Sequence, residues 1–252
     1  MADNEKTNLF ALVGKNISYS FSRGYFAEKF TLLELKNHDY INFDIDSIDQ
    51  LPSKLHEYKK SIKGLNVTIP YKQDVFKYLD KVNKKAVKIG AVNTIKITKK
   101  GKLKGYNTDY YGFKNSITPL LKPHHKKALI LGTGGASKAV AYALKKMNIE
   151  YRFVSRNPKG PLQISYNSIN SSLLEKFTVL INCTPLGTHP NVNECPDIPY
   201  SELTSNHLLY DLIYNPALSL FLEKGKMQGA TVKNGYEMLE LQAEKAWEIW
   251  NK

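Results

Sequence analysis

The stretch from Gly132 to Ser137 has the residue types and the placement that a pyrophosphate site requires. It reads Gly-Thr-Gly-Gly-Ala-Ser, follows the apolar run 128–131, and opens the helix-like run 138–144. In a strand, turn and helix of this kind, glycines let the backbone approach the ligand, and unpaired N–H groups of the helix point at the phosphates. The same residues could also form a glycine turn in an α/β protein that binds no nucleotide.

A second strand, 151–154, ends at Ser-Arg-Asn, where the type of dinucleotide is usually decided. An NAD-binding unit normally places Asp or Glu there, to accept a hydrogen bond from the ribose 2′-hydroxyl. Glu150 lies at the opposite end of this strand, whereas Arg156 stands where a guanidinium can face a 2′-phosphate, with Lys159 nearby. The pattern favours NADP over NAD, against the alternative that Arg156 is a solvated surface residue.

A lysine follows another strand. The segment 64–72 carries the polar residues Asn66 and Thr68, reaches Pro70, which ends the strand, and then Lys72, which starts a helix. Ligands of open α/β sheets bind beyond the carboxyl ends of the strands. A lysine there can act as a general acid or base, although taken alone it is more often an ordinary surface residue.

Asn-Thr pairs end two further apolar strands, at 93–94 and at 107–108, and Asp109 follows the second pair. Asp109 could pair with Lys72, orienting it and holding it charged. The alternative is that Asn-Thr-Asp caps the following helix, which is compatible with a catalytic role.

Three serines alternate with aromatic residues near the N-terminus, at Ser18, Ser20 and Ser22. On an extended segment the three hydroxyls share one face. They would suit a carboxylate or a polyol; alternatively, they form a hydroxyl-rich turn that caps the next helix, whose periodic residues begin at Tyr25.

The order of elements predicts a two-lobed α/β protein. In the first half we expect strands at 9–13, 40–45, 66–69, 91–97 and 103–106. In the second half, strands at 127–132, 150–155, 178–183 and 207–213 alternate with helical runs, which is typical of a doubly wound parallel sheet. We expect a substrate and catalytic domain at 1–109, a linking helix at 110–121 within a dinucleotide-binding domain at 110–234, and a final segment, 235–252, that packs back on the first domain.

Composition narrows the class of protein. The chain has 252 residues, of which 42% are hydrophobic and 11% aromatic, so it is long and apolar enough for a folded core. Its net charge of +13 comes from dispersed lysines with no zinc-finger spacing, which favours a soluble enzyme with anionic ligands over a nucleic-acid binder. Its two cysteines show neither metal nor disulfide spacing, and no apolar run is long enough for a membrane span. With an acidic, polar N-terminus, these features predict a cytoplasmic protein without a signal peptide.

Taken together, the motifs resemble the shikimate dehydrogenase family nearly end to end. The motifs are Gly14 with Ser20-Phe21-Ser22, 66–72, 90–94, 107–109, 132–137, 182–187, 210–216, and 235–239 with Gln242. The resemblance implies a two-lobed fold with an N-terminal α/β substrate domain and a Rossmann-type NADP-binding domain. It also implies NADPH-dependent, reversible reduction of 3-dehydroshikimate to shikimate, in the pathway to chorismate and the aromatic amino acids. No metal is implied, and monomer and homodimer stay open.

The resemblance also assigns roles by position. Lys72 is implied as the general acid/base and Asp109 as its partner. Ser20 and Ser22 are implied to hold the substrate carboxylate, and further substrate contacts are implied at Thr68, Asn93, Tyr214 and Gln242. The implied cofactor positions are Gly132, Thr133, Gly134, Gly135, Ala136, Ser155, Arg156, Asn157, Thr184, Leu212, Gly235 and Met238.

The chain departs from the usual family pattern at two places. Tyr19 and Arg23 stand where the family often has His and Pro, and Gly160 stands where it often has a second arginine at the cofactor turn. Two alternatives stay open at this point. One is a quinate/shikimate dehydrogenase with a broader substrate range or NAD use. The other is a non-catalytic protein of the same fold that binds a metabolite or nucleic acid, against which the Lys72 and Asp109 pair argues.

Overall fold

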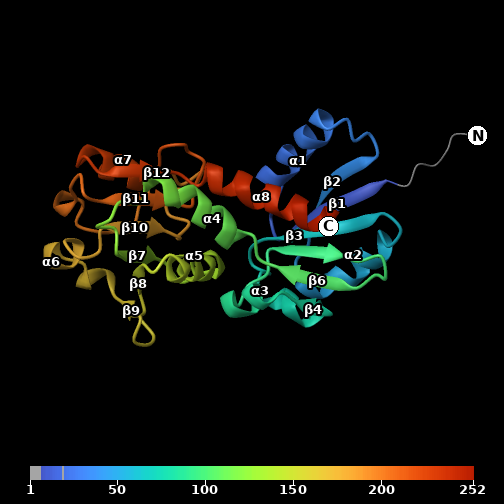
Figure 1. Cartoon of the computed structure of the whole chain (residues 1–252), viewed down its shortest axis with the longest axis horizontal. Helices are drawn as coiled ribbons and strands as arrows, with labels where there is room; N and C mark the ends of the chain where they lie inside the picture. The colour runs from blue at the N-terminus through green and yellow to red at the C-terminus, as the bar shows by residue number, and fades with distance from the viewer. Residues whose placement is uncertain (1–6, 19) are drawn as a thin grey trace, which may run out of the picture. The chain divides into compact units, whose positions relative to one another are not determined.

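A computed structural model describes residues 7–18 and 20–252, so Tyr19 lies outside the described residues. Within these residues the chain forms two compact units. Unit 1 comprises the chain up to Thr108 together with Ala243–Lys252, and unit 2 comprises Asp109–Gln242. Each unit is built on its own sheet (Figure 1).

Unit 1 is a mixed α/β unit. Its described elements are β1 (Asn8–Gly14), α1 (Phe21–Leu32), β2 (His38–Asp44), α2 (Leu51–Glu57), β3 (Ile62–Val67), a 3₁₀ helix (Asp74–Tyr78), β4 (Lys81–Val82), α3 (Lys84–Ile89), β5 (Thr94–Ile97) and β6 (Leu103–Tyr106). The described strands lie in the order β2-β1-β3-β5-β6-β4. Strand β5 runs antiparallel to β3 and β6, and the predicted turn between β5 and β6 contains Gly101, whose φ of +73° favours glycine. The other pairs are parallel.

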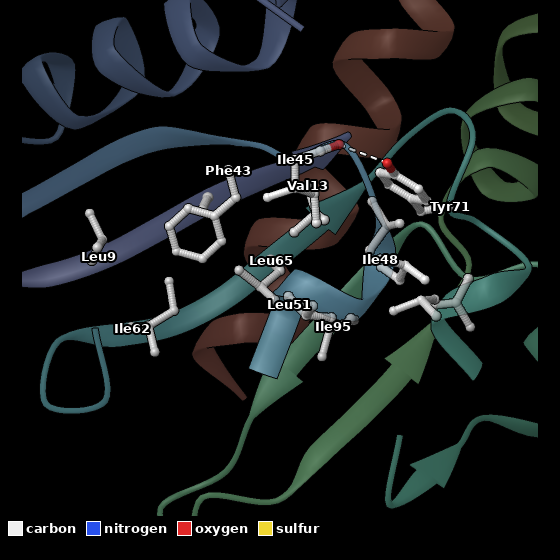
Figure 2. Packing of buried hydrophobic residues seen from close by; sticks show 14 of the residues in the cluster. Leu9, Val13, Phe43, Ile45, Ile48, Leu51, Ile62, Leu65, Tyr71 and Ile95 are labelled. Atoms are coloured by element: carbon white, nitrogen blue, oxygen red, sulfur yellow. Dashed lines mark hydrogen bonds between the residues drawn. The ribbon is translucent and has the colours of Figure 1, made fainter. Parts of the chain in front are cut away.

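The interior strand β1 is buried on both faces, so its side chains divide alternately between two apolar clusters. Leu9, Ala11 and Val13 pack with Phe43 and Leu65 on one face, where α2 also lies (Figure 2). Phe10 and Leu12 pack on the other face against α1 and the end of the last helix; the members of this second cluster include Phe26, Phe30, Tyr40, Ala246 and Trp250.

Unit 2 is a parallel α/β unit. Its described elements are α4 (Asp109–Ile117), β7 (Lys127–Leu131), α5 (Gly135–Lys146), β8 (Glu150–Val154), β9 (Gln163–Ile164), α6 (Ser171–Leu174), β10 (Val179–Asn182), β11 (Leu208–Asp211), α7 (Leu220–Met227), β12 (Thr231–Lys233) and α8 (Tyr236–Asn251), whose last residues belong to unit 1. The described strands pair in parallel in the order β12-β11-β10-β7-β8-β9.

This sheet confirms the predicted doubly wound, Rossmann-type architecture. The chain proceeds outward from β7 to β8 and β9, and then resumes at β10 on the other side of β7. The strand order therefore reverses between β7 and β10, and in open sheets the crevice at such a point binds ligands. Apolar side chains of α4 and α5 cover one face, and those of α6 and α7 cover the other.

The structure differs from the sequence-based expectation in two places that affect the site. Helix α1 begins at Phe21 rather than near Tyr25. The boundary between the units falls inside α8 rather than at residue 235: Met238 packs in the core of unit 2, whereas Ala243 and Ala246 pack in the core of unit 1.

Candidate functional site

The glycine turn joins β7 to α5 at the point where the strand order reverses. Gly132 has a φ of +100°, and a Cβ there would lie 3.0 Å from Cγ2 of Thr184, so both conformation and space favour glycine. Gly134 is the N-cap of α5, and no heavy atom lies within 4 Å of the position that its Cβ would take. Because no side chain caps α5, the first N–H groups of this helix can donate to a phosphate.

A cavity of about 630 Å³ opens at this turn within unit 2. Its lining includes the predicted cofactor residues Gly132, Thr133, Gly134, Ser155, Arg156, Asn157 and Thr184. It also includes residues that the sequence analysis did not select, among them Tyr166, Cys183, Leu186, Cys195 and Asp197. A turn in which Gly132 and Gly134 have no Cβ atom, together with a nearby arginine, fits a dinucleotide that carries a 2′-phosphate.

Other predicted cofactor residues do not line this cavity. Gly135 and Ala136 form the first turn of α5. Gly235 is required by close packing, because a Cβ there would lie 2.2 Å from the carbonyl oxygen of Leu212. Met238 is buried in the core of unit 2. Lys159 is exposed and is also not among the lining residues.

Thr184 is held by a chain of buried polar groups. Oδ1 of Asn182 accepts hydrogen bonds from the Thr184 N–H at 3.0 Å and from its hydroxyl at 2.6 Å. Nδ2 of Asn182 donates to Oδ1 of Asp211 at 3.0 Å, and Oδ2 of Asp211 accepts from the Ser219 hydroxyl at 2.5 Å. These linked hydrogen bonds fix the loop after β10 against β11. They therefore shape the wall of the cavity to which Thr184 belongs.

Burial raises the pKa of Asp211 to about 6, although its three hydrogen-bond donors oppose the shift. As the pH rises, Asp211 therefore ionises near pH 4 in the unfolded chain but only near pH 6 in the folded protein. Between these two pH values the unfolded state is favoured increasingly, so the free energy of unfolding falls. A shift of about two pKa units corresponds to about 3 kcal/mol of free energy of unfolding.

Asp211→Asn should remove this pH dependence. An asparagine at this position can still accept from Asn182 and the Ile213 N–H through Oδ1, and can donate to Ser219 through Nδ2. The measurement is the free energy of urea unfolding at pH 4 and pH 7 for both proteins. We expect the wild type to lose about 2 kcal/mol more than the variant between the two values, because part of the loss has already occurred at pH 4 and contributions from all other groups cancel. Exposed Asp197→Asn is the control; equal pH dependence in wild type and Asp211→Asn would contradict the assignment.

Lys72 stands on a rigidly held backbone in unit 1. Its neighbour Tyr71 is 4% exposed, and the Tyr71 hydroxyl donates to the carbonyl oxygen of Ile45 at 2.7 Å (Figure 2). The Lys72 carbonyl accepts from the Val92 N–H at 2.8 Å. Lys72 itself is half-buried in a turn, and the predicted helix is the short 3₁₀ helix that begins at Asp74.

The carboxyl ends of β3 and β6 meet the amino end of antiparallel β5 in a buried polar network. The Asn93-Thr94 pair therefore begins a strand, and the expectation that it ends one was wrong. The Asn93 amide donates to the Thr108 hydroxyl at 2.9 Å and accepts from the Thr108 N–H at 2.6 Å. Asn66 donates to the Asn93 carbonyl at 3.3 Å and accepts from the Tyr40 hydroxyl at 2.8 Å. Thr68 follows β3, half-buried. No role had been predicted for Asn66 or Tyr40: Asn66 was expected as a polar residue of one strand and Tyr40 as part of another.

The serines lie at the start of α1 and not on an extended strand, so that expectation was wrong. Ser20 is the N-cap residue, but its side chain makes no capping hydrogen bond, and Ser22 lies in the first helical turn. Ser18 is exposed in the preceding turn. Ser20 and Ser22 still meet at one helix N-terminus, where N–H groups and the helix dipole favour an anion.

The remaining predicted residues belong to unit 2. Asp109 is the first residue of α4 and is 6% exposed. Gln242 is 7% exposed and donates to the Leu239 carbonyl at 3.1 Å, and Tyr214 lies half-buried between β11 and α7. Lys72 belongs to unit 1 and Asp109 to unit 2, so the pairing of the two side chains stays a prediction.

No helix in the described part of the chain is long and apolar enough to cross a membrane. Within residues 7–18 and 20–252, no group of three or more His, Cys, Asp and Glu side chains could hold a metal ion.

Comparison with known proteins identifies the family. Residues 12–95 match the model of the shikimate dehydrogenase substrate-binding domain. The chain is 39% identical over 258 residues to the shikimate dehydrogenase (NADP(+)) of Clostridium botulinum, covering 95% of both chains. It is 36% identical to the enzyme of the same name from Methanococcus vannielii, covering 98% of this chain and 92% of the relative. The chain belongs to the shikimate dehydrogenase family.

The fold of this shikimate dehydrogenase family member is also shared with solved structures. One is the shikimate 5-dehydrogenase of Thermus thermophilus in complex with NADP(H) and shikimate, with a TM-score of 0.85 and 30% identity. The match covers 97% of this chain and 93% of that chain. The sequence motifs had therefore indicated the right family.

Proposed function

We propose that this protein catalyses the NADPH-dependent, reversible reduction of 3-dehydroshikimate to shikimate, in the pathway to chorismate and aromatic amino acids. The observation that carries the proposal is the cavity at the glycine turn, which presents Arg156 beside an uncapped helix start. This arrangement suits a dinucleotide with a 2′-phosphate, and the relatives named above use NADP(+).

The reaction adds a hydride to a carbonyl carbon and a proton to its oxygen. When bound, NADPH supplies the hydride. We assign the proton to Lys72, whose ammonium donates it to the carbonyl oxygen and takes it back from the hydroxyl in the reverse direction. We assign to Asp109 the role of holding Lys72 charged and oriented.

We assign the substrate carboxylate to the start of α1. Ser20 and Ser22 offer two hydroxyl donors at a helix N-terminus, where the helix dipole adds to the attraction for an anion. Thr68 follows the carboxyl end of β3, and Asn93 directly precedes β5 at the same edge of the sheet. Both would contact the ring hydroxyls, as would Tyr214 and Gln242. The proposed cofactor site is completed by five residues that do not line the cavity: Gly135, Ala136, Leu212, Gly235 and Met238.

Ser22→Ala should raise KM for 3-dehydroshikimate about tenfold or more, because a hydrogen bond to a charged group contributes about 1.5–3 kcal/mol. The KM for NADPH should stay unchanged. Exposed Ser18→Ala is the matched control. If Ser18→Ala raised KM more than Ser22→Ala, the clamp would be formed by the earlier serines, and if neither changed KM, the serines would not bind the carboxylate.

The direct test is the loss of NADPH absorbance when the purified protein is given 3-dehydroshikimate. We expect turnover with NADPH and much less with NADH. Comparable oxidation of quinate would instead support the broader quinate/shikimate dehydrogenase, and absence of turnover with either substrate would support the non-catalytic binding protein.

The same proposal extends to the setting of the enzyme. Its two free cysteines, Cys183 and Cys195, suit a reducing compartment, and we propose a cytoplasmic enzyme whose partners are small molecules rather than nucleic acid or membranes. Gel filtration with light scattering will distinguish the monomer from the homodimer.

A further inference from the structure

Thr184 follows β10 and lines the cavity beside the glycine turn. Its methyl group faces that turn, since Cγ2 lies 3.0 Å from the position that a Cβ of Gly132 would take. The side chain also carries a hydroxyl, which can donate one hydrogen bond and accept two. The kind of ligand group that fits this part of the wall therefore depends on where the hydroxyl proton points.

The proton of the Thr184 hydroxyl is directed at Asn182. Oδ1 of Asn182 lies 3.0 Å from the Thr184 backbone nitrogen and 2.6 Å from Oγ1 of Thr184. A backbone N–H can only donate, so the Asn182 atom that faces Thr184 is the amide oxygen and not the amide nitrogen. Because an amide oxygen has no proton, the Thr184 hydroxyl must donate to it.

The other side of the Asn182 amide requires the same orientation. Nδ2 donates to Oδ1 of Asp211 at 3.0 Å, and the same carboxylate oxygen accepts from the Ile213 N–H at 3.0 Å. Asn182 and Asp211 are both fully buried. A reversed amide would set donor against donor at Thr184 and acceptor against acceptor at Asp211, which is costly for buried groups.

Thr184 is thereby left as an acceptor towards the cavity. The Leu186 N–H donates to Oγ1 at the long distance of 3.3 Å, which leaves the second lone pair of Oγ1 for a ligand. A ligand group that binds this oxygen must supply an N–H or an O–H. Phosphate oxygens act as acceptors, so Thr184 does not match the pyrophosphate, although it adjoins the glycine turn.

The order of the strands places Thr184 on the nicotinamide side of the site. Arg156, which we assign to the 2′-phosphate of the adenosine half, follows β8, whereas β10 lies on the opposite side of β7. A dinucleotide binds across the point where the strand order reverses, with one half on each side. The half that reaches the loop after β10 carries two kinds of donor, the ribose hydroxyls and the carboxamide N–H.

We propose that Thr184 accepts a hydrogen bond from the nicotinamide half of the cofactor, and that Asn182 is the positioning residue that makes Thr184 an acceptor. The inference rests on the proposed function and assigns a chemical role within its cofactor site. Because the Thr184 proton is already held by Asn182, the hydroxyl does not have to be ordered when the cofactor binds, which favours affinity.

Thr184→Val tests the acceptor, because it keeps the shape of the side chain and the backbone N–H that donates to Asn182. The Kd for NADPH, measured by fluorescence titration without substrate, should rise about fivefold, within the range of one neutral hydrogen bond. The Kd for adenosine 2′-phosphate 5′-diphosphate, which has the adenosine half and two linked phosphates but no nicotinamide ribose, should stay within about twofold. An equal loss for this probe would show that Thr184 binds phosphate, and no loss for NADPH would show that it binds neither donor; either result would overturn the proposal.

The two possible donors are distinguished with the reduced 3-acetylpyridine analogue of NADP, in which a methyl group replaces the carboxamide amino group. If Thr184→Val weakens binding of NADPH and not of the analogue, the donor is the carboxamide N–H. If it weakens binding of both alike while the adenosine probe is unaffected, the donor is a ribose hydroxyl. Both results support the proposal.

Thr188→Val is the matched control. Thr188 is an exposed threonine of the same loop and is not among the cavity-lining residues. Its substitution should leave the Kd for NADPH unchanged. A rise equal to that of Thr184→Val would show a general effect of losing a hydroxyl from this loop and would overturn the proposal.

A double-mutant cycle tests the positioning role of Asn182. Asn182→Leu should lower the midpoint of thermal unfolding, because Asp211 loses a donor, and should raise the Kd for NADPH severalfold. In a Thr184→Val background the same substitution should change this Kd by less than about twofold, because the hydroxyl that Asn182 orients is missing. Equal rises in both backgrounds, or an equal rise for adenosine 2′-phosphate 5′-diphosphate, would show a purely structural role and overturn the assignment.

Thr184→Val decides the proposal even if Asn182→Leu does not fold, because a loss for NADPH without a loss for the phosphate probe follows from the polarity that Asn182 imposes. A wild-type protein that bound neither NADPH nor the adenosine probe would instead refute the proposed function. The two failures are therefore distinguishable.

Discussion

Lys72→Ala should lower kcat by about 10²- to 10⁴-fold, which is the usual contribution of a general acid or base. The backbone of Lys72 is held by the buried Tyr71 and by the hydrogen bond from the Val92 N–H. Truncation of the side chain therefore removes the proton donor and leaves the conformation of the turn unchanged. The measurement is steady-state reduction of 3-dehydroshikimate with NADPH, and KM should change much less than kcat.

Lys88→Ala provides the control for loss of one positive charge, because Lys88 is exposed on α3 of the same unit. It should leave kcat unchanged. A Lys72→Ala variant that retained near wild-type kcat would show that another group supplies the proton.

Arg156→Ala should weaken binding of NADPH about 10- to 150-fold and leave binding of NADH nearly unchanged. The basis is a charge-assisted contact to the 2′-phosphate, which contributes about 1.5–3 kcal/mol. Arg156 is exposed at the cavity rim, with Asn157 beside it. Fluorescence titration with each dinucleotide measures the effect without catalysis.

The matched control is Lys159→Ala, three residues away, because Lys159 is exposed but is not among the cavity-lining residues. It should weaken NADPH binding by less than about twofold. Equal losses for NADPH and NADH in Arg156→Ala would show that Arg156 does not distinguish the two cofactors, and the NADP preference would need another residue.

The residues next to each strand were sufficient to predict the position of the cofactor turn from the sequence. Gly132 directly follows β7, and Arg156 lies two residues after the end of β8. The carboxyl ends of parallel strands meet at one edge of the sheet, so the proximity of these two residues followed from the pattern alone. The doubly wound sheet was predictable for the same reason, because its apolar strands alternate with helical runs.

Long-range contacts had no such signal. Tyr40 looked like an ordinary strand residue, and its contact with Asn66 joins positions 26 residues apart. Tyr166 reaches the cavity because β9, a strand of two residues, pairs with β8, and such a short strand leaves no periodicity to detect. The start of α1 was misplaced because Arg23 and Gly24 interrupt the apolar pattern, although Phe21 already belongs to the helix.

The glycine at the N-cap of α5 has a consequence for thermodynamic linkage. A serine or aspartate at that position would stabilise the helix start of the folded chain by only a few tenths of a kcal/mol more than Gly134 does, with or without ligand, whereas Gly134 leaves the first N–H groups to whatever anion binds there. Ligand that binds only the folded chain adds RT ln(1 + [L]/Kd), or about 2.7 kcal/mol at one hundred times Kd. The resistance of unit 2 to unfolding is therefore tied to the concentration of its dinucleotide, and it falls with the logarithm of that concentration while the site is still nearly saturated.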